Sequence, residues 1–247
     1  MIDKERILEA KRVLEAEGNA IFSTANKLDL NFSKCVDLII NCKGKIVISG
    51  IGKSGNIGRK ITSTLASLGT PSIFLHTSDA FHGDLGNLRK NDLLILISNS
   101  GETDELQKLL NYAKINGNKS IAITGNINSN ISKKANYCLD ASVESEACTL
   151  NLAPTCSTSV TMALGDALAI ICAMERGFKE IDFARFHPSG NLHKSNFEIE
   201  KILRKRFLYS YCLGQKNSAV TGTSISVWFP QCGHSTAWES STSGTVS

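Results

Sequence analysis

Five side chains that can transfer protons or hold charge lie close to short polar turns: Lys53, His82, Glu105, Glu146 and His187. Carboxylates and imidazoles accept and return protons, and an ammonium group stabilises an oxygen that gains negative charge. Each residue alone also has a simpler explanation, because a glutamate early in a helix complements the helix dipole and a loop histidine is commonly solvated. Their shared position in turns, where catalytic residues concentrate, favours proton transfer on a small substrate.

The hexapeptide SNSGET begins at Ser98, directly after the apolar run LLILI. Ser98, Ser100 and Thr103 supply three hydroxyl groups, and Gly101 lets the backbone approach a ligand closely. A helix predicted over 102–115 directs its free amides to the same place, as a phosphate requires. The alternative is that Ser100 or Thr103 only caps this helix, which explains one hydroxyl but not three. We therefore predict a phosphate site, and with the nearby glutamates and histidines it indicates proton transfer on a sugar phosphate.

A second turn contains a literal GxGxxG pattern, formed by Gly50, Gly52 and Gly55. A dinucleotide site would need an acid at the end of the next strand, where the sequence reads FLHTS and offers none. A P-loop would need glycine at the position of Val47. The turn is therefore interpreted as an anion site at a helix start, with Lys53 beside it. No cofactor or metal spacing is found in the sequence, and we expect none to be used.

The order of apolar and polar segments predicts an α/β fold. Two helical patterns, 3–28 and 31–42, come first, with Asp3 as a candidate cap. Five apolar runs then alternate with helical stretches, which indicates a parallel sheet covered on both faces. The runs lie at 45–55, 72–76, 93–101, 120–126 and 136–141, and the helical stretches at 55–68, 102–115 and 127–135. A long helix is predicted over 157–176 with Gly177 as its stop, followed by a loop at 182–191.

Composition and charge exclude several classes of protein. The 247 residues are 42% hydrophobic and 20% charged with a net charge of +4, as in a soluble globular protein. The N-terminus is charged, so no signal peptide is expected, and no apolar run is predicted to reach membrane-spanning length. Eight cysteines are scattered without metal spacing. We predict a cytoplasmic protein that binds neither nucleic acid nor membrane.

Six sequence blocks together resemble the D-arabinose 5-phosphate isomerases, which carry a sugar isomerase (SIS) domain. The blocks are GIGKSGNIGRK, AFHGDLG, ISNSGETDE, EACTLNLAPT, STSVTMALGDALA and HPSGN, in that order. The resemblance implies a flavodoxin-like three-layer fold with a central parallel sheet, usually in a homotetramer. It implies an intramolecular oxidoreductase that interconverts D-ribulose 5-phosphate and D-arabinose 5-phosphate. This reaction starts the route to the Kdo sugar of lipopolysaccharide or capsule.

The resemblance also suggests roles for individual residues. It assigns the phosphate to Ser98, Ser100 and Thr103, joined by Ser54 from the glycine turn. It matches Lys53, His82, Glu105, Glu146 and His187 to the family's catalytic candidates. For an enediol mechanism we expect Glu105 or Glu146 to move the carbon proton, Lys53 to stabilise charge, and the two histidines to serve ring opening or oxygen-proton transfer. Glu102, within the phosphate turn, is expected to be structural.

The expected organisation has three parts: N-terminal helices at 1–44, a SIS domain at 45–194 and an atypical, poorly ordered tail at 195–247. The tail shows no pattern of the two CBS domains that most family members carry, so we expect none here. Two blocks depart from the family. His187-Pro188-Ser189-Gly190 stands for His-Pro-Gly-Gly, and the residues from Cys148 to Asn151 stand for Cys-Pro-Leu-Gly. Both changes remove residues with special backbone conformations.

Other interpretations remain open. A SIS protein can bind a sugar phosphate as a sensor without converting it, and a degenerate, inactive member is also possible. Sensors usually carry a DNA-binding helix-turn-helix ahead of the SIS domain, and residues 1–44 look too short for one. A third interpretation is an isomerase acting on sedoheptulose 7-phosphate or a hexulose phosphate, which the HGDLG and EAC…LAPT blocks disfavour.

Overall fold

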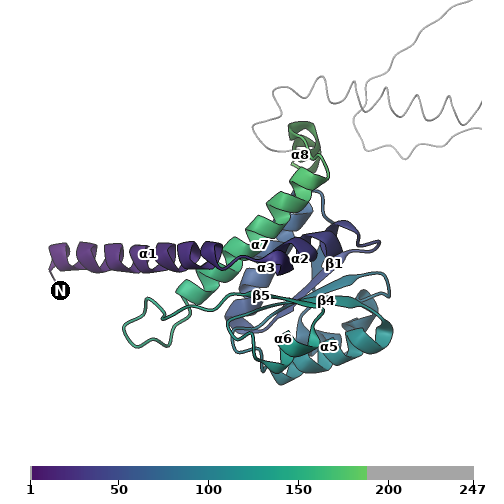
Figure 1. Ribbon diagram of the computed structural model, residues 1–247, viewed down its shortest axis with the longest axis horizontal. Helices are drawn as coiled ribbons and strands as arrows, with labels where there is room; N and C mark the ends of the chain where they lie inside the picture. The colour runs from purple at the N-terminus through teal and green to yellow at the C-terminus, as the bar shows by residue number, and fades with distance from the viewer. Residues whose placement is uncertain (1, 188–247) are drawn as a thin grey trace, which may run out of the picture. The chain divides into compact units, whose positions relative to one another are not determined.

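The computed structural model describes residues 2–187 and contains one parallel sheet of five strands (Figure 1). The strand order is β2-β1-β3-β4-β5, and every neighbouring pair is parallel. This order is that of flavodoxin-like domains. The strands are β1 Ile46–Gly50, β2 Ser72–Phe74, β3 Leu93–Ile97, β4 Lys119–Thr124 and β5 Tyr137–Asp140. The predicted fold class and all five strands are confirmed.

Helices cover both faces of the sheet and give the three layers. One face packs on α2, α3 and α7, and the other on α4, α5 and α6. Alternate residues of β3 serve the two sides, since Ile95 belongs to the first core and Leu94 to the second. The helices are α1 Asp3–Asn26, α2 Leu30–Ile40, α3 Gly52–Ser67, α4 Thr77–Ala80, α5 Asp104–Asn116, α6 Asn130–Lys134, α7 Cys156–Glu175 and α8 Glu180–Phe186, with a 3-10 turn η1 at Asp84–Asn87.

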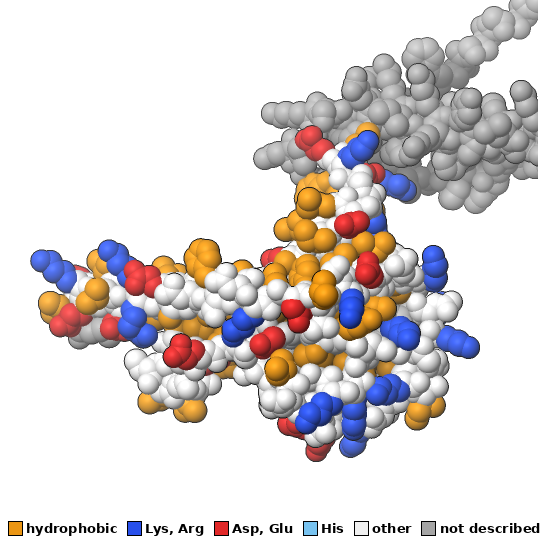
Figure 2. Space-filling model, in the orientation of Figure 1, with side chains coloured by type: hydrophobic (Ala, Val, Ile, Leu, Met, Phe, Trp, Pro, Cys, Tyr) orange, Lys and Arg blue, Asp and Glu red, His pale blue; other side chains and the backbone are white. Residues whose placement is uncertain are grey.

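Helices α1 and α2 pack on the same layer as α7. The first turns of α1 extend beyond the sheet, and its exposed side carries both hydrophobic and charged side chains (Figure 2). The exposed hydrophobic residues of this helix include Ile7, Leu8, Leu14 and Phe22.

Several predicted boundaries need correction. Residues 182–191 were predicted to be a loop, but α8 occupies Glu180–Phe186, with Asp182 accepting a bond from the Lys179 amide at 3.0 Å. Helix α1 has Ile2, not Asp3, as its N-cap residue. Gly177 ends α7 in the left-handed conformation, as predicted. The predictions for residues 195–247, and the Ser189 departure, lie outside the described residues.

The expectation that no apolar run could span a membrane needs a correction at α7. Within residues 2–187, the segment Cys156–Glu175 is long enough, with a mean hydropathy of 1.6. Of the 18-residue stretch of this helix that has this mean hydropathy, 56% is buried inside the fold. Helix α7 packs on α1, α2 and α3, so its apolar surface is explained by its place in the core.

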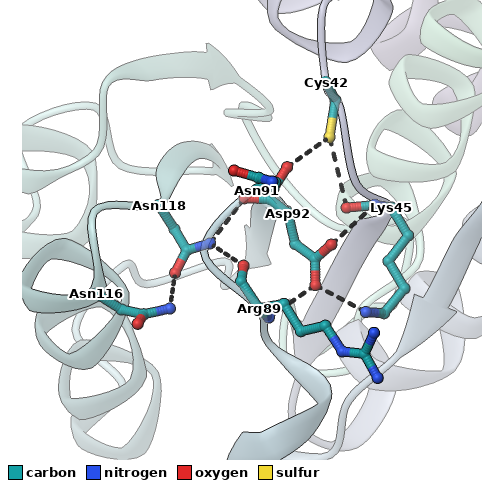
Figure 3. A network of polar contacts seen from close by, with 7 residues as sticks. All are labelled: Cys42, Lys45, Arg89, Asn91, Asp92, Asn116 and Asn118. Atoms are coloured by element: carbon teal, nitrogen blue, oxygen red, sulfur yellow. Dashed lines mark hydrogen bonds and ion pairs between the residues drawn. The ribbon is translucent and has the colours of Figure 1, made fainter.

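A polar cluster joins the strands at their N-terminal edge (Figure 3). The buried Asp92 carboxylate accepts bonds from the Lys45 amide at 2.9 Å, the Lys45 ammonium at 2.7 Å and the Arg89 amide at 2.8 Å. Asn118 donates to the carbonyl groups of Arg89 and Asp92 at 2.6 and 2.8 Å. This cluster, which we call the N-edge clasp, ties the starts of β1, β3 and β4 together and leaves the opposite edge for ligands.

Candidate functional site

The candidate site lies where the strand order reverses. Strand β1 has β2 on one side and β3 on the other. The connection after β1 therefore leads toward one edge strand of the sheet, and the connection after β3 leads toward the other. Ligands of open α/β sheets bind outside the carboxyl ends of the strands at this point. Gly50 and Ile97 are register partners at the ends of β1 and β3. The glycine turn and the SNSGET turn therefore lie side by side.

The glycine turn leads into α3 without a side-chain cap. Its N-cap residue, Ile51, has no side-chain hydrogen-bonding group, so the first amides of the helix are available to an anion. Gly52 has φ +58°, a conformation that favours glycine. Lys53 is exposed and Ser54 half-buried in this first helical turn. The turn thus combines free amides, one hydroxyl and one ammonium group.

The hydroxyl groups of the SNSGET turn hold the turn itself in shape. The buried Ser98 Oγ accepts a bond from the Gly101 amide at 3.0 Å and pairs with Thr103 Oγ1 at 3.0 Å. Ser100 Oγ accepts from the Glu102 amide at 3.2 Å. Thr103 is the N-cap residue of α5 but makes no side-chain capping bond. The Thr103 side chain therefore does not cap α5 in this structure. The helix starts at Asp104, two residues later than predicted.

Glu102 has a structural contact that supports its expected role. Its carboxylate accepts bonds from the Asn130 amide at 2.9 Å and from the Asn130 side chain at 2.6 Å. The bond from the Asn130 amide lowers the pKa of Glu102. Glu102 thus joins the SNSGET turn to the start of α6. Glu105 lies in the first turn of α5, after the SNSGET turn, and is exposed.

Glu146 is held at the N-terminus of α7. Its Oε2 accepts bonds from the Thr155 amide at 2.7 Å, the Thr155 hydroxyl at 3.0 Å and the Ser157 amide at 3.2 Å. Burial would raise the pKa of Glu146, but the hydrogen bonds from Ser157 and Thr155 outweigh it and lower that pKa. The half-buried carboxylate is therefore ionised at neutral pH.

The departure at Asn151 does not remove the special backbone conformation near Glu146. Asn151 has φ +52°, the left-handed region that asparagine tolerates better than most residues. Its Oδ1 also accepts a bond from the Glu146 amide at 2.7 Å. Asparagine therefore keeps a backbone conformation that favours glycine and adds a side-chain contact. The expected loss of backbone-special residues is wrong at this position.

Helices α3 and α7 run parallel and bring Glu146 to the end of the molecule that carries the glycine turn. Lys60 of α3 pairs with Asp166 of α7, and Arg176, directly after α7, donates to Thr70, three residues after α3. Both contacts join residues that are 106 positions apart, so the two segments run in the same direction. The same offset places the first turn of α7, where Glu146 is bound, alongside the first turn of α3. The structure therefore gathers the turns of Lys53 and Ser54, the SNSGET turn and Glu146 at one end.

The two histidines lie at different ends. His82 is exposed in the turn after α4, and the chain reaches it from the carboxyl end of β2. His187 ends α8, where its ring stacks on Phe183 with 3.9 Å between centroids. Helix α7 separates α8 from Glu146 by 20 residues, about 30 Å. Phe186 lies 3.8 Å from the position of a Cβ on Gly69, near the start of β2. This chain therefore does not place its own His187 beside the other candidates.

Three residues that the sequence reasoning did not select also lie beside Lys53. His76, Arg59 and Asn56 line an open hollow of about 380 Å³ together with the glycine turn. His76 follows β2, and its Nδ1 is buried without a hydrogen-bond partner within the described residues. The sequence reasoning tested the end of this strand only for an acid. The general rule that polar residues at strand ends form the site would have found the histidine.

These features define a flavodoxin-like α/β domain with a candidate anion site at its topological switch point and a hydrogen-bonded carboxylate at the start of α7. A family model for the SIS domain matches residues 38–171. This chain belongs to the SIS domain family.

Curated relatives agree with the resemblance seen in the sequence. The chain is 50% identical to an arabinose 5-phosphate isomerase of Escherichia coli over 192 residues, covering 77% of this chain and 61% of the relative. It is 48% identical to an arabinose 5-phosphate isomerase of Pseudomonas aeruginosa, covering 75% and 57%. A solved structure from E. coli CFT073, in complex with arabinose 5-phosphate, has a TM-score of 0.74 at 38% identity, covering 76% of this chain and all of that one. The chain thus spans little more than half the length of the curated relatives that it matches.

Proposed function

We propose that this protein is an aldose–ketose isomerase that interconverts D-ribulose 5-phosphate and D-arabinose 5-phosphate through an enediol. The observation that carries the proposal is the hydrogen-bonded Glu146 carboxylate at the start of α7, together with the two polar turns that follow β1 and β3. Relatives named arabinose 5-phosphate isomerases support the choice of substrate. We further propose a cytoplasmic role in making the Kdo sugar for lipopolysaccharide or capsule, carried by a domain at 45–194.

The substrate phosphate binds between the two turns. Ser54 and the amides of the first turn of α3 contact it from one side, and Ser100 and Thr103 from the other. Ser98 is buried and bonded to Gly101, so it contributes mainly by shaping the turn and orienting Thr103. Binding at this place leaves the sugar carbons free to reach the carboxylates.

Proton transfer between C1 and C2 needs a base and a cation. Glu146 Oε2 already accepts three bonds, so Oε1 is the oxygen that faces a substrate proton. Glu105 is the second candidate because it lies in the first turn of α5. Lys53 stabilises the oxygen that gains charge in the enediol. The reaction moves protons only, and we propose no cofactor.

The histidines serve ring opening and oxygen-proton transfer in this proposal. His82 belongs to the same chain as Lys53. His187 lies about 30 Å away along α7, so it reaches a site only if a second copy supplies it. The homotetramer implied by the resemblance to known isomerases provides such copies. The site is therefore proposed to be shared between chains.

Identification of the product tests this function. Purified protein is incubated with D-ribulose 5-phosphate, and the sugars are identified by NMR. Formation of D-arabinose 5-phosphate supports the proposal. A different epimer or another sugar would contradict the substrate assignment. Saturable binding without any conversion would favour the sensor or degenerate interpretation, which the comparisons do not support.

A further inference from the structure

Helix α1 reaches the segment that carries Glu146 through polar contacts. Arg12 Nη2 donates to the Ala147 carbonyl at 3.0 Å, and Lys27 Nζ donates to the Ser142 carbonyl at 3.3 Å. Glu17 Oε2 accepts from Ser159 Oγ at 2.7 Å, in the first turn of α7. These contacts join parts of the chain that are far apart in sequence. Helix α1 therefore runs along the 141–155 loop and the start of α7 (Figure 1).

The contact of Arg12 acts on the residue next to Glu146. Ala147 is buried, and its amide donates to Thr155 Oγ1 at 2.8 Å. The Thr155 hydroxyl in turn donates to the Glu146 carboxylate at 3.0 Å. Ala147 is thus held through its carbonyl by Arg12 and through its amide by Thr155. The two contacts therefore hold the peptide groups on both sides of Ala147, including the one that joins it to Glu146.

We propose that Arg12 is a positioning residue, through which α1 braces Glu146 for proton transfer. Arg12 touches neither substrate nor reacting atoms in this proposal. Its side chain is 45% exposed and also pairs with Glu9, so its replacement leaves the core unchanged. The N-terminal helix, which lies outside the matched SIS segment at 38–171, becomes part of the working site.

The first test uses kinetics and rests on the proposed function. Arg12→Ala is expected to lower kcat about tenfold, because a small displacement of a catalytic group is costly, with little change in KM. Arg12→Lys, which keeps a donor on a long side chain, restores most of the turnover. Arg6→Ala is the matched control, since Arg6 lies on the same helix and, within residues 2–187, its side chain pairs only with exposed Asp3. Equal kcat for wild type and Arg12→Ala would overturn the proposal.

The second test does not depend on any activity. Amide hydrogen exchange of the full chain reports on the bonds that hold Glu146, through the amides of Ala147, Thr155 and Ser157. Arg12→Ala is expected to speed their exchange several-fold, whereas Arg12→Lys and Arg6→Ala leave it close to wild type. Unchanged exchange in Arg12→Ala would reject the brace. An inactive wild type with faster exchange in Arg12→Ala would reject the proposed function while supporting the brace.

Discussion

At the scale of single residues, Glu146 has a structural role, to which our proposal adds a chemical one. Its Oε2 satisfies amides at the start of α7, which otherwise lack partners. The same bonds fix the direction of Oε1 and keep the carboxylate ionised at neutral pH. A base with a lowered pKa accepts a proton less readily than one tuned to neutrality. Precise orientation is therefore the main contribution we ascribe to this residue.

Replacing Glu146 tests this assignment. Glu146→Gln keeps the shape and one hydrogen-bond acceptor but removes the base, so we expect turnover to fall at least about 100-fold. Thermal unfolding, followed by circular dichroism, establishes that the variant is folded. Glu144→Gln is the control, since Glu144 is an exposed neighbour in the same loop. Turnover close to that of the wild type in folded Glu146→Gln would assign the chemistry to Glu105 instead.

At the scale of elements, the SNSGET turn depends on close contact with the start of α6. Gly101 has φ +67°, and a Cβ there would lie 2.0 Å from Ser129 Oγ. Strain and overlap both oppose a larger residue, so Gly101→Ala is expected to cost roughly 2–3 kcal/mol of stability and to weaken phosphate binding. Chemical denaturation and KM measure the two effects.

Gly18→Ala is the control for Gly101. Gly18 lies inside α1, and among the described residues nothing beyond the adjacent backbone of its own helix lies within 4 Å of an added Cβ. This substitution should therefore raise stability by about 0.5–1 kcal/mol, because alanine favours helix more than glycine does. A destabilisation of similar size in both variants would contradict the account of the turn.

The N-edge clasp makes a second prediction at this scale. Asp92 is buried and bonded three times, whereas the Lys60–Asp166 pair is exposed. Asp92→Ala leaves Lys45 without its partner and is expected to cost about 3–5 kcal/mol, while Asp166→Ala costs at most about 1 kcal/mol. Unfolding by denaturant at pH 7 compares the two. Equal losses would show that the clasp does not hold the strand starts.

The clasp also predicts a pH dependence. Burial would raise the pKa of Asp92, but the bonds from Lys45 and Arg89 outweigh it and lower that pKa. A group with a lowered folded pKa stabilises the fold above its ordinary pKa, near 3.8, and loses that contribution as the pH falls through the folded value. The stability difference between wild type and Asp92→Ala should therefore shrink below about pH 4.

Some elements could be predicted from the sequence and others could not. The run LLILI is uniformly apolar and short, so a strand covered on both faces is its natural interpretation. Helix α8 was missed because HPSG directly after it suggested a loop. The contact between Arg12 and Ala147 depends on how two distant segments pack, and no local pattern encodes it.

At the scale of the whole molecule, the two edges of the sheet differ in role. The clasp closes the N-terminal edge, and the candidate residues gather at the other, with His187 as the exception. The positions of the glycine turn and the SNSGET turn could be predicted from the sequence, because the carboxyl ends of parallel strands lie at the same edge of the sheet. The position of His187 could not be predicted, since the length and direction of α7 decide where that residue lies.

A shared site predicts complementation between inactive variants. If one copy supplies Lys53 and another supplies His187, then oligomers made only of Lys53→Ala or only of His187→Ala should be inactive. In an equal mixture, random subunit exchange should bring an intact Lys53 and an intact His187 together at about a quarter of the sites. About a quarter of the wild-type sites should therefore be restored. Turnover of mixed and unmixed samples measures this. No recovery after verified exchange would contradict a shared site.

The most direct test of the central claim is the approach to equilibrium from both sides. The protein is incubated separately with D-ribulose 5-phosphate and with D-arabinose 5-phosphate, and each sugar is quantified over time. We predict that both reactions converge on one ratio of the two sugars, at a rate that Glu146→Gln lowers at least about 100-fold. Saturable binding of both sugars with no conversion from either side would contradict the assignment as an isomerase.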